Sequence, residues 1–299
     1  MSPPDSPAIV NARKRAILLV IGASATFTVA AACVKGLAGE IPLAQVIFCR
    51  NAFALPILVA LLMRAGGLSL MRPRSPLNHL LRTIFGLTGM SGAFAGFTHL
   101  PLATATVLGF TMPLFLTAFS VLFLGERVGW RRWTAVVVGF AGVLLVARPG
   151  LGEALPLVPV LLVLMGAVGW ALSMMTIRRM GEAGEHGVAI VMWFAIGSSV
   201  LSGMIAIPAW VAPDPHQWML LIGLGAISAI AQLLMTEGYR RGETTMLAPF
   251  EYAGLFFTML IGVLFWREWP GVLDLLGFAV LVGAGLFIWW RETKLGLRP

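Results

Sequence analysis

Charged residues are scarce in this sequence. Asp, Glu, Lys and Arg make up only 11% of its 299 residues, whereas 59% are hydrophobic. A soluble domain of this size could not bury so much apolar surface, so the composition excludes an ordinary water-soluble protein and indicates a membrane protein. Cysteine is also rare. Cys33 and Cys49 lie in apolar runs without a CxxC or a His cluster nearby, which indicates buried small residues and not a disulfide or a metal site.

Motifs for catalysis and for ATP use are missing as well. The sequence has no GxxxxGK[ST], HExxH or GxSxG, and no apolar run carries paired carboxylates at helical spacing. It therefore predicts neither an enzyme nor an ATP-driven pump, and we expect no catalytic residue, metal or cofactor. No TVGYG-like filter or ring of acidic residues indicates a channel. If the protein moves a solute, we expect transport to use a solute gradient or coupling to an ion.

Long apolar runs fill most of the chain. A bilayer core about 30 Å thick needs roughly 20 apolar residues per helix, and ten runs qualify. They are Ala16–Leu37, Ala44–Met63, Leu81–Phe97, Ala103–Leu124, Trp133–Ala147, Leu157–Ile177, Val188–Trp210, Trp218–Gly238, Met246–Phe265 and Val272–Trp290. The sequence therefore predicts an all-α integral membrane protein with ten transmembrane helices.

Basic residues give these spans an orientation. If the chain starts inside and the spans alternate, nearly all Lys and Arg residues, Arg82 among them, fall in inner segments. Only Lys35, Arg148 and Arg267 fall outside, and Arg50 lies within a span. This bias is typical of the positive-inside rule. It predicts a bacterial-type inner-membrane protein with both termini in the cytoplasm, and it explains the net charge of +8 without a nucleic-acid partner.

One pattern occurs twice. At 103–148 and at 244–291, a long apolar span ends in Leu-Phe, a Glu follows after two residues (Glu126, Glu268), and a shorter Gly-spaced span comes next. Five spans precede the loop before Leu157 and five follow it. Because five is odd, the second half enters the membrane from the opposite side, as in transporters built from inverted repeats.

This duplication divides the chain into five parts. We expect a cytoplasmic tail at 1–15, a first five-helix repeat at 16–148 and an external linker at 149–156. A second, inverted repeat at 157–290 and a cytoplasmic tail at 291–299 complete the chain. The two repeats should enclose a central cavity.

The repeat also carries a family resemblance. The segment LFLGERVGW, the Gly-spaced span after it, and Arg50 in VIFCRNAFALPIL resemble the drug/metabolite transporter superfamily, in particular its ten-helix EamA-type members. The resemblance covers nearly the whole chain, although WREW replaces LGER in the second copy and no proline there matches Pro113. It implies secondary transport of small organic solutes by alternating access. The aromatic and neutral amino-acid exporters of this group look closest in length and in pocket candidates.

Other functions stay open at this point. Within the superfamily, the alternatives are export of drugs, cationic metabolites or nucleotide sugars. From another class, the chain could be a membrane enzyme or an assembly scaffold. A carboxylate at mid-membrane depth would favour cations, and only Glu251 is a candidate.

Tryptophans away from the span ends are candidates for the substrate pocket. Most tryptophans fall near predicted span ends, as an interfacial belt requires, but Trp170 and Trp193 do not. An indole at depth can fill the bundle core, or its flat face can bind an aromatic or aliphatic side chain. Trp170 is the stronger candidate.

Charged residues within or near spans are rare and often functional. Arg50 could bind a substrate carboxylate, or it could pair with a carbonyl or with Glu40. Lys35, at the outer end of the first span, is expected to extend toward the interface. Glu126 and Glu268 are expected to tie helix ends together.

Further polar residues lie in the eighth and ninth spans. Gln232 is placed for a polar pocket contact, and Glu251 beside Tyr252 could take a proton or bind an ammonium group. Glu237 is expected to pair with Arg240 and Arg241 on one helix face.

Three residues have predicted structural or gating roles. Pro113 removes a backbone hydrogen bond midway along the fourth span, which either shapes the pocket or only bends the helix. Gly92 and Gly96 form a GxxxG pair that either packs two helices closely or provides a sliding surface.

Overall fold

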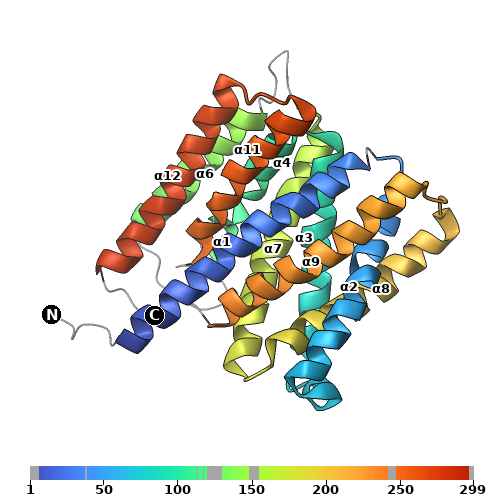
Figure 1. The fold of residues 1–299 in the computed structure, drawn as a ribbon. Helices are drawn as coiled ribbons and strands as arrows, with labels where there is room; N and C mark the ends of the chain where they lie inside the picture. Colours follow the sequence, from blue (N-terminus) through green and yellow to red (C-terminus); the bar gives the residue numbers. More distant parts are fainter. Residues whose placement is uncertain are drawn as a thin grey trace.

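A computed structural model describes residues 7–37, 39–112, 114–116, 118–119, 130–147, 155–241 and 247–295. Every regular element in these ranges is helical (Figure 1). The α-helices are α1 (Pro7–Gly36), α2 (Leu43–Ala65), α3 (Pro76–His99), α4 (Leu102–Gly109), α6 (Trp130–Ala147), α7 (Leu157–Glu182), α8 (Gly187–Ala206), α9 (Pro215–Arg241), α11 (Ala253–Trp266) and α12 (Val272–Leu295). The 3-10 helices are η1 (Gly67–Met71), η2 (Ile207–Ala209) and η3 (Ala248–Tyr252). The predicted all-α fold is confirmed.

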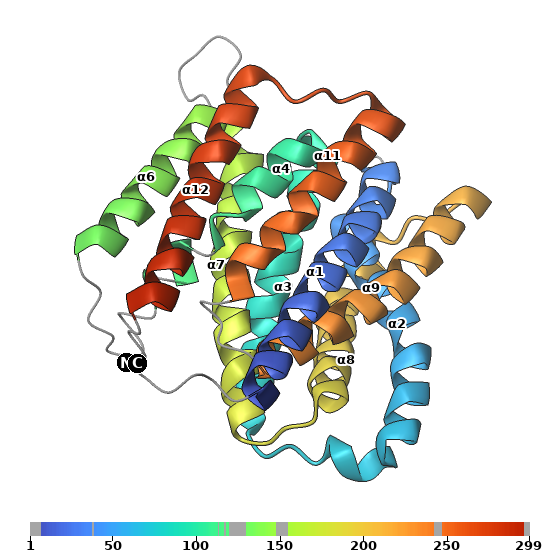
Figure 2. The same cartoon turned by 60° about the vertical axis from the view of Figure 1, so that its left-hand side comes forward.

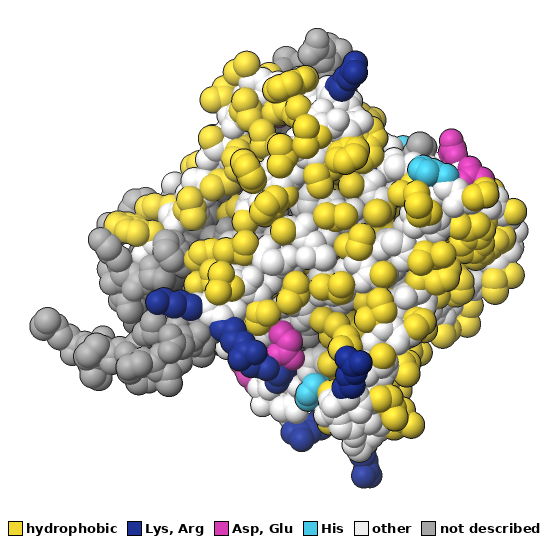
Figure 3. Space-filling view, in the orientation of Figure 1, with side chains coloured by type: hydrophobic (Ala, Val, Ile, Leu, Met, Phe, Trp, Pro, Cys, Tyr) yellow, Lys and Arg dark blue, Asp and Glu magenta, His cyan; other side chains and the backbone are white. Residues whose placement is uncertain are grey.

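The outer surface of the bundle suits lipid. Five described helical stretches are long and apolar enough to cross a membrane. They are Lys14–Gly36, Leu43–Ala65, Leu157–Glu182, Gly187–Ala209 and Pro215–Arg241. Large apolar side chains such as Leu18, Ile205 and Phe265 are exposed on the surface, where water would disfavour a patch of this extent. Figure 3 shows a broad apolar surface, with Lys and Arg gathered mainly along the lower edge of the view.

The fourth and ninth predicted spans are not continuous α-helices, which corrects the sequence prediction. α4 ends at Gly109, and Phe110 and Thr111 form a turn before the helical residues resume. The Thr111 hydroxyl donates to the carbonyl of Leu108 at 2.8 Å, and such local bonds compete with the regular helix. The ninth span begins as the 3-10 helix η3 and becomes α-helical only at Ala253.

Helices pack in a small number of pairs (Figures 1 and 2). α3 lies along α7, α1 lies along α9, α2 lies along α8, and α6 lies along α12; α4 contacts α11. In both views α6 and α12 stand together at one side of the bundle, away from α2 and α8. Each of these pairs joins a helix from before residue 150 to one from after it.

The contact between α3 and α7 brings two backbones together. A Cβ added at Gly92 would lie 2.2 Å from the carbonyl oxygen of Leu162, and one at Gly166 would lie 2.9 Å from the Cα of Gly92. A Cβ at Gly96 would lie 2.4 Å from a methyl group of Val163. Small residues allow such an approach inside a membrane. The geometry therefore gives Gly92 and Gly96 a packing role.

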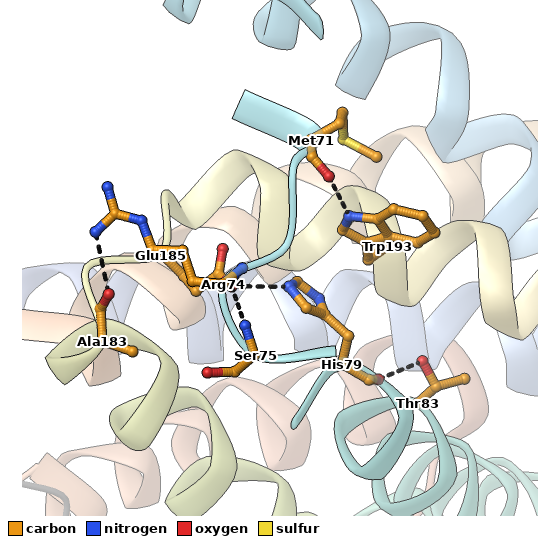
Figure 4. A network of polar contacts seen from close by, with 8 residues as sticks. All are labelled: Met71, Arg74, Ser75, His79, Thr83, Ala183, Glu185 and Trp193. Carbon is orange, nitrogen blue, oxygen red and sulfur yellow. Dashed lines mark hydrogen bonds and ion pairs between the residues drawn. The ribbon is translucent and has the colours of Figure 1, made fainter. Parts of the chain in front are cut away.

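Polar contacts tie the connections at one end of the bundle. Glu185, between α7 and α8, is buried and accepts hydrogen bonds from the backbone N–H groups of Arg74 and Ser75 at 2.6 and 3.1 Å. Nε2 of His79 lies 3.3 Å from the same oxygen. Figure 4 shows the segment before α3 gathered around this carboxylate. The loop before α3 is thus joined to the loop after α7.

A second group of polar contacts lies at the opposite end of the bundle. Nζ of Lys35 lies 2.7 Å from Glu268 and donates to the carbonyl of Leu100 at 3.2 Å. The other oxygen of Glu268 accepts from the N–H of Leu102 at 2.9 Å. The predicted role of Glu268 in tying helix ends is confirmed, whereas the prediction that Lys35 extends to the interface is wrong, because this carboxylate holds it. Glu126 lies outside the described residues.

The glycine contact generates the first prediction. Gly92→Ala places a methyl group where the α7 backbone already lies, so we expect overpacking that costs about 1–3 kcal/mol. The midpoint of thermal unfolding of the purified protein in detergent should fall. Gly223→Ala is the control, because a Cβ at Gly223 of α9 meets nothing within 4 Å. An unchanged midpoint for Gly92→Ala would contradict the close approach of α3 and α7.

Candidate binding cavity

A cavity of about 190 Å³ lies inside the bundle. Residues of α1, α2, α3, α4, α7, α8, α9, η3 and α11 line it, so both halves of the chain contribute. The lining is mainly apolar, with few polar side chains, as is typical of small-molecule sites. The polar side chains on the wall are Ser24, Thr28, Arg50, Thr106, Ser228, Gln232, Glu251 and Thr258.

Glu251 provides the negative group of this cavity. It is 7% exposed, and three separate elements meet at its carboxylate. Nε1 of Trp170 on α7 donates to one oxygen at 3.4 Å, and the hydroxyl of Tyr239 on α9 donates to the other. Phe27 of α1 packs edge-on against the Trp170 indole, with ring centroids 5.8 Å apart. These contacts supply the donors that a buried carboxylate needs and fix its position in η3.

Arg50 provides a positive group on the same wall. Its side chain is 5% exposed. One guanidinium nitrogen donates to Oδ1 of Asn51 at 3.0 Å, and the other terminal nitrogen lies 3.5 Å from Oε1 of Gln232. The predicted pairing with a carbonyl is confirmed, through the side-chain amide carbonyls of Asn51 and Gln232. The alternative of Glu40 is wrong, because Glu40 accepts from Gln217 at 2.6 Å. Among the described residues, Arg50 therefore has neutral amide partners and no counter-ion.

The structure brings together four of the six predicted binding residues. Trp170, Gln232, Glu251 and Arg50 all line the cavity. Tyr252 is buried next to the cavity, where its ring lies 4.9 Å from that of Phe110.

Trp193 lies elsewhere. Its Nε1 donates to the carbonyl of Met71 at 3.0 Å and its ring packs against His79 (Figure 4). α8 begins at Gly187, so Trp193 lies in its second turn, close to the polar connection around Glu185.

The remaining predictions have mixed outcomes. Glu237 pairs with Arg240 and Arg241 at 3.1 and 2.6 Å, as predicted. Pro113 lies outside the described residues. Tyr239 was not among the sequence candidates, although it is one of only two tyrosines in the chain and a phenol inside an apolar bundle needs a partner.

Comparison with known proteins adds the family. A model of the EamA-like transporter family matches residues 14–148 and, again, residues 157–290. The chain belongs to the EamA-like transporter family. The resemblance read from LFLGERVGW and Arg50 is thereby confirmed, and with it membership of the drug/metabolite transporter superfamily. Members of this family are multi-pass membrane transporters.

Individual relatives carry different solutes. The chain is 31% identical to a pseudopaline exporter of Pseudomonas aeruginosa, over 96% of this chain and 100% of that protein. It is 28% identical to an S-adenosylmethionine uptake transporter of Rickettsia felis, over 84% of each chain. A crystal structure with 22% sequence identity superposes with a TM-score of 0.69, over 96% of this chain and 99% of that one, and so shares the fold.

The site generates a second prediction, on the carboxylate of Glu251. Tyr239→Phe removes one donor from this buried group and should destabilise the protein by about 1–3 kcal/mol. In Glu251→Gln the same phenol loses its charged acceptor, so the two substitutions act on one bond. Thermal unfolding of both single variants and the double variant should therefore give a coupling of about 0.5–3 kcal/mol. Strictly additive effects would show that the two side chains do not interact.

Proposed function

We infer that this transporter exports small zwitterionic solutes of the amino-acid type across a bacterial inner membrane. The observation that carries the proposal is the pair of opposite charges in one apolar cavity. Glu251 can bind an ammonium group and Arg50 a carboxylate, and among the described residues the two side chains form no ion pair with each other. Charged groups at such depth usually serve a ligand or a relay.

The apolar part of the wall supports an aromatic or other neutral side chain on the solute. Phe27, Phe94 and Trp170 present ring surfaces to the cavity, and aromatic faces bind flat or aliphatic groups well. A cavity of this size suits a compact solute. The aromatic and neutral amino acids expected from the family resemblance fit this chemistry.

The arrangement of helices supports two inverted halves at 16–148 and 157–290. If α1, α2, α3, α4 and α6 correspond in order to α7, α8, α9, α11 and α12, the α3–α7 contact maps onto the α9–α1 contact. The α2–α8, α4–α11 and α6–α12 contacts map onto themselves. The interrupted fourth and ninth spans also correspond, and transporters of inverted design use interrupted helices in matching positions at the site.

This symmetry favours alternating access. Two similar halves of opposite sense can open a shared site to either side of the membrane by rocking against each other. The direction of export is proposed on the basis of the pseudopaline exporter, which the chain matches along its whole length. A carrier is favoured over an enzyme or a scaffold because the family consists of transporters.

A cationic solute is the second candidate. Glu251 is the acidic side chain on the described wall, and a carboxylate with aromatic neighbours binds cations well. Arg50 on the same wall argues against a solute without a negative group, because two unlike charges recognise a zwitterion better than a pure cation.

Reconstitution tests the proposed function. Purified protein in liposomes should exchange labelled phenylalanine or leucine, and Glu251→Gln should lower the initial rate at least about tenfold, since a charge-assisted hydrogen bond is lost. Trp170→Ala should also impair exchange without loss of expression. Trp269→Ala is the matched control, because this indole is 78% exposed on the surface.

Two outcomes would contradict the proposal. Exchange of organic cations but of no amino acid would favour the second candidate. Full activity of Trp170→Ala would remove this indole from the site.

The orientation gives a separate prediction. The first turn of α1 and the last turn of α12 lie on the same side as the α2–α3 and α7–α8 connections (Figures 1 and 2), which agrees with two termini on one face. A fluorescent protein fused to Pro299 should fluoresce in the cytoplasm, and alkaline phosphatase fused there should be inactive. Active phosphatase would place the C-terminus outside and contradict the predicted orientation. Labelling that placed the N-terminus on the opposite face from the C-terminus would contradict the inverted halves.

A further inference from the structure

Arg82 is buried beside Gly86 and Phe194, two residues that line the cavity. It lies about two turns into α3, and its side chain is 1% exposed. Charge counting along the sequence assigns it to an inner loop segment, and the structure corrects this. Arg82 belongs to the helix and reaches into the protein.

The guanidinium of Arg82 has no counter-ion in the part of the chain that the structure describes. Its Nε and both terminal nitrogens are buried, and none has a hydrogen-bond partner among the described residues. The flat face of the group lies over the ring of Phe194, 4.0 Å from the ring centroid. A cation–π contact engages the face of a guanidinium, but its N–H donors point outward along the edge. A buried charge whose N–H groups have no acceptor raises the free energy of the folded protein, unless an anion or another acceptor binds it.

Two residues next to the Arg82 guanidinium line the cavity, although Arg82 itself does not. Gly86 lines the wall one turn after Arg82, and a Cβ at Gly86 would lie only 2.1 Å from Nη1 of Arg82. Phe194, which the guanidinium covers, also lines the wall. The missing side chain at Gly86 therefore leaves the room that the guanidinium occupies beside the cavity.

Arg50 is the second cation of this region. It lines the same cavity as Gly86 and Phe194, the two residues that adjoin the Arg82 guanidinium. Two like charges out of water repel each other, and the amide oxygens of Asn51 and Gln232 neutralise neither of them. Nε2 of Gln232 is also without a partner among the described residues. One cation therefore lines the cavity and a second lies next to residues of its wall.

We propose that Arg50 and Arg82 together form an anion subsite, and that the amino-acid solutes of this carrier include those with a second carboxylate. Guanidinium groups are suited to carboxylates because their planar donors match the two oxygens. With Glu251 binding the ammonium, a solute with one positive and two negative groups balances the three charged side chains. This inference rests on the proposed function for the ammonium group, but the anion subsite itself does not depend on it.

Glutamate and glutamine provide matched probes, because they differ little in size and only glutamate has the second carboxylate. Succinate has two carboxylates and no ammonium group. Binding to the full-length protein in detergent can be measured by calorimetric titration and by the shift of the thermal midpoint. We expect wild-type protein to bind glutamate at least about tenfold more tightly than glutamine, and to be stabilised by succinate.

Arg82→Gln should abolish the preference for glutamate and the effect of succinate, while affinity for glutamine stays within about twofold. Without ligand, this variant should unfold at the same or a higher temperature than wild type, because an unpaired buried charge is gone. A purely structural arginine would give the opposite shift. Arg178→Gln is the control, because Arg178 pairs with the exposed Glu182 on the helix surface.

Gly86→Ala is an independent variant if Arg82→Gln does not fold. It keeps both charges but displaces the Arg82 guanidinium, so the preference for glutamate should fall while binding of glutamine persists. Arg82→Lys should restore only part of the preference, since an ammonium lacks the planar donor pair.

The outcomes separate the two proposals. If amino acids are exchanged but wild-type protein binds glutamate no better than glutamine, the anion subsite is refuted and the proposed function stands. If succinate stabilises wild type and not Arg82→Gln, but no amino acid is bound or exchanged, the proposed function fails and the subsite stands. If neither glutamate nor succinate affects wild type, the subsite is refuted.

Discussion

A charge held out of water needs a partner, and this constraint organises the polar groups of the bundle. At one end of the bundle, Glu185 accepts hydrogen bonds from two backbone N–H groups and contacts His79. At the other end, Glu268 forms an ion pair with Lys35. Glu251 receives donors from two helices inside the cavity. Each acid therefore joins segments that are distant in the sequence. Because lipid offers no hydrogen bonds, such contacts fix how the helices register with each other.

Direct backbone contact complements these polar ties. Along α3 and α7 the glycines at 89, 92, 166 and 169 remove the side chains that would otherwise separate the two helices. Without water between them, helices in a membrane gain from such close packing. The two helices therefore pack closely where the two halves meet, and the cavity lies beside this contact. Arg82 and Trp170 lie one on each of these helices.

Hydropathy and charge bias could predict the helical class and the approximate spans, because both follow from the cost of moving residues into lipid. The same reasoning misassigned Arg82, since a count of basic residues near span ends does not say which way a side chain points. It ranked Trp170 above Trp193, but only the packing shows that Trp170 lines the cavity and that Trp193 bonds to Met71. The turn at Phe110 and Thr111 depends on hydrogen bonds that hydropathy does not contain. The cavity residues come from many helices, so only the tertiary structure shows that they lie together.

The carboxylate of Glu251 joins α7, α9 and η3 through its hydrogen bonds with Trp170 and Tyr239. In the proposed carrier, an arriving ammonium group would compete with these two donors for the same two oxygens. Solute binding would then weaken the contacts among three elements at once. Turnover of the proposed carrier would thus depend on its cargo, which would limit leakage across the membrane.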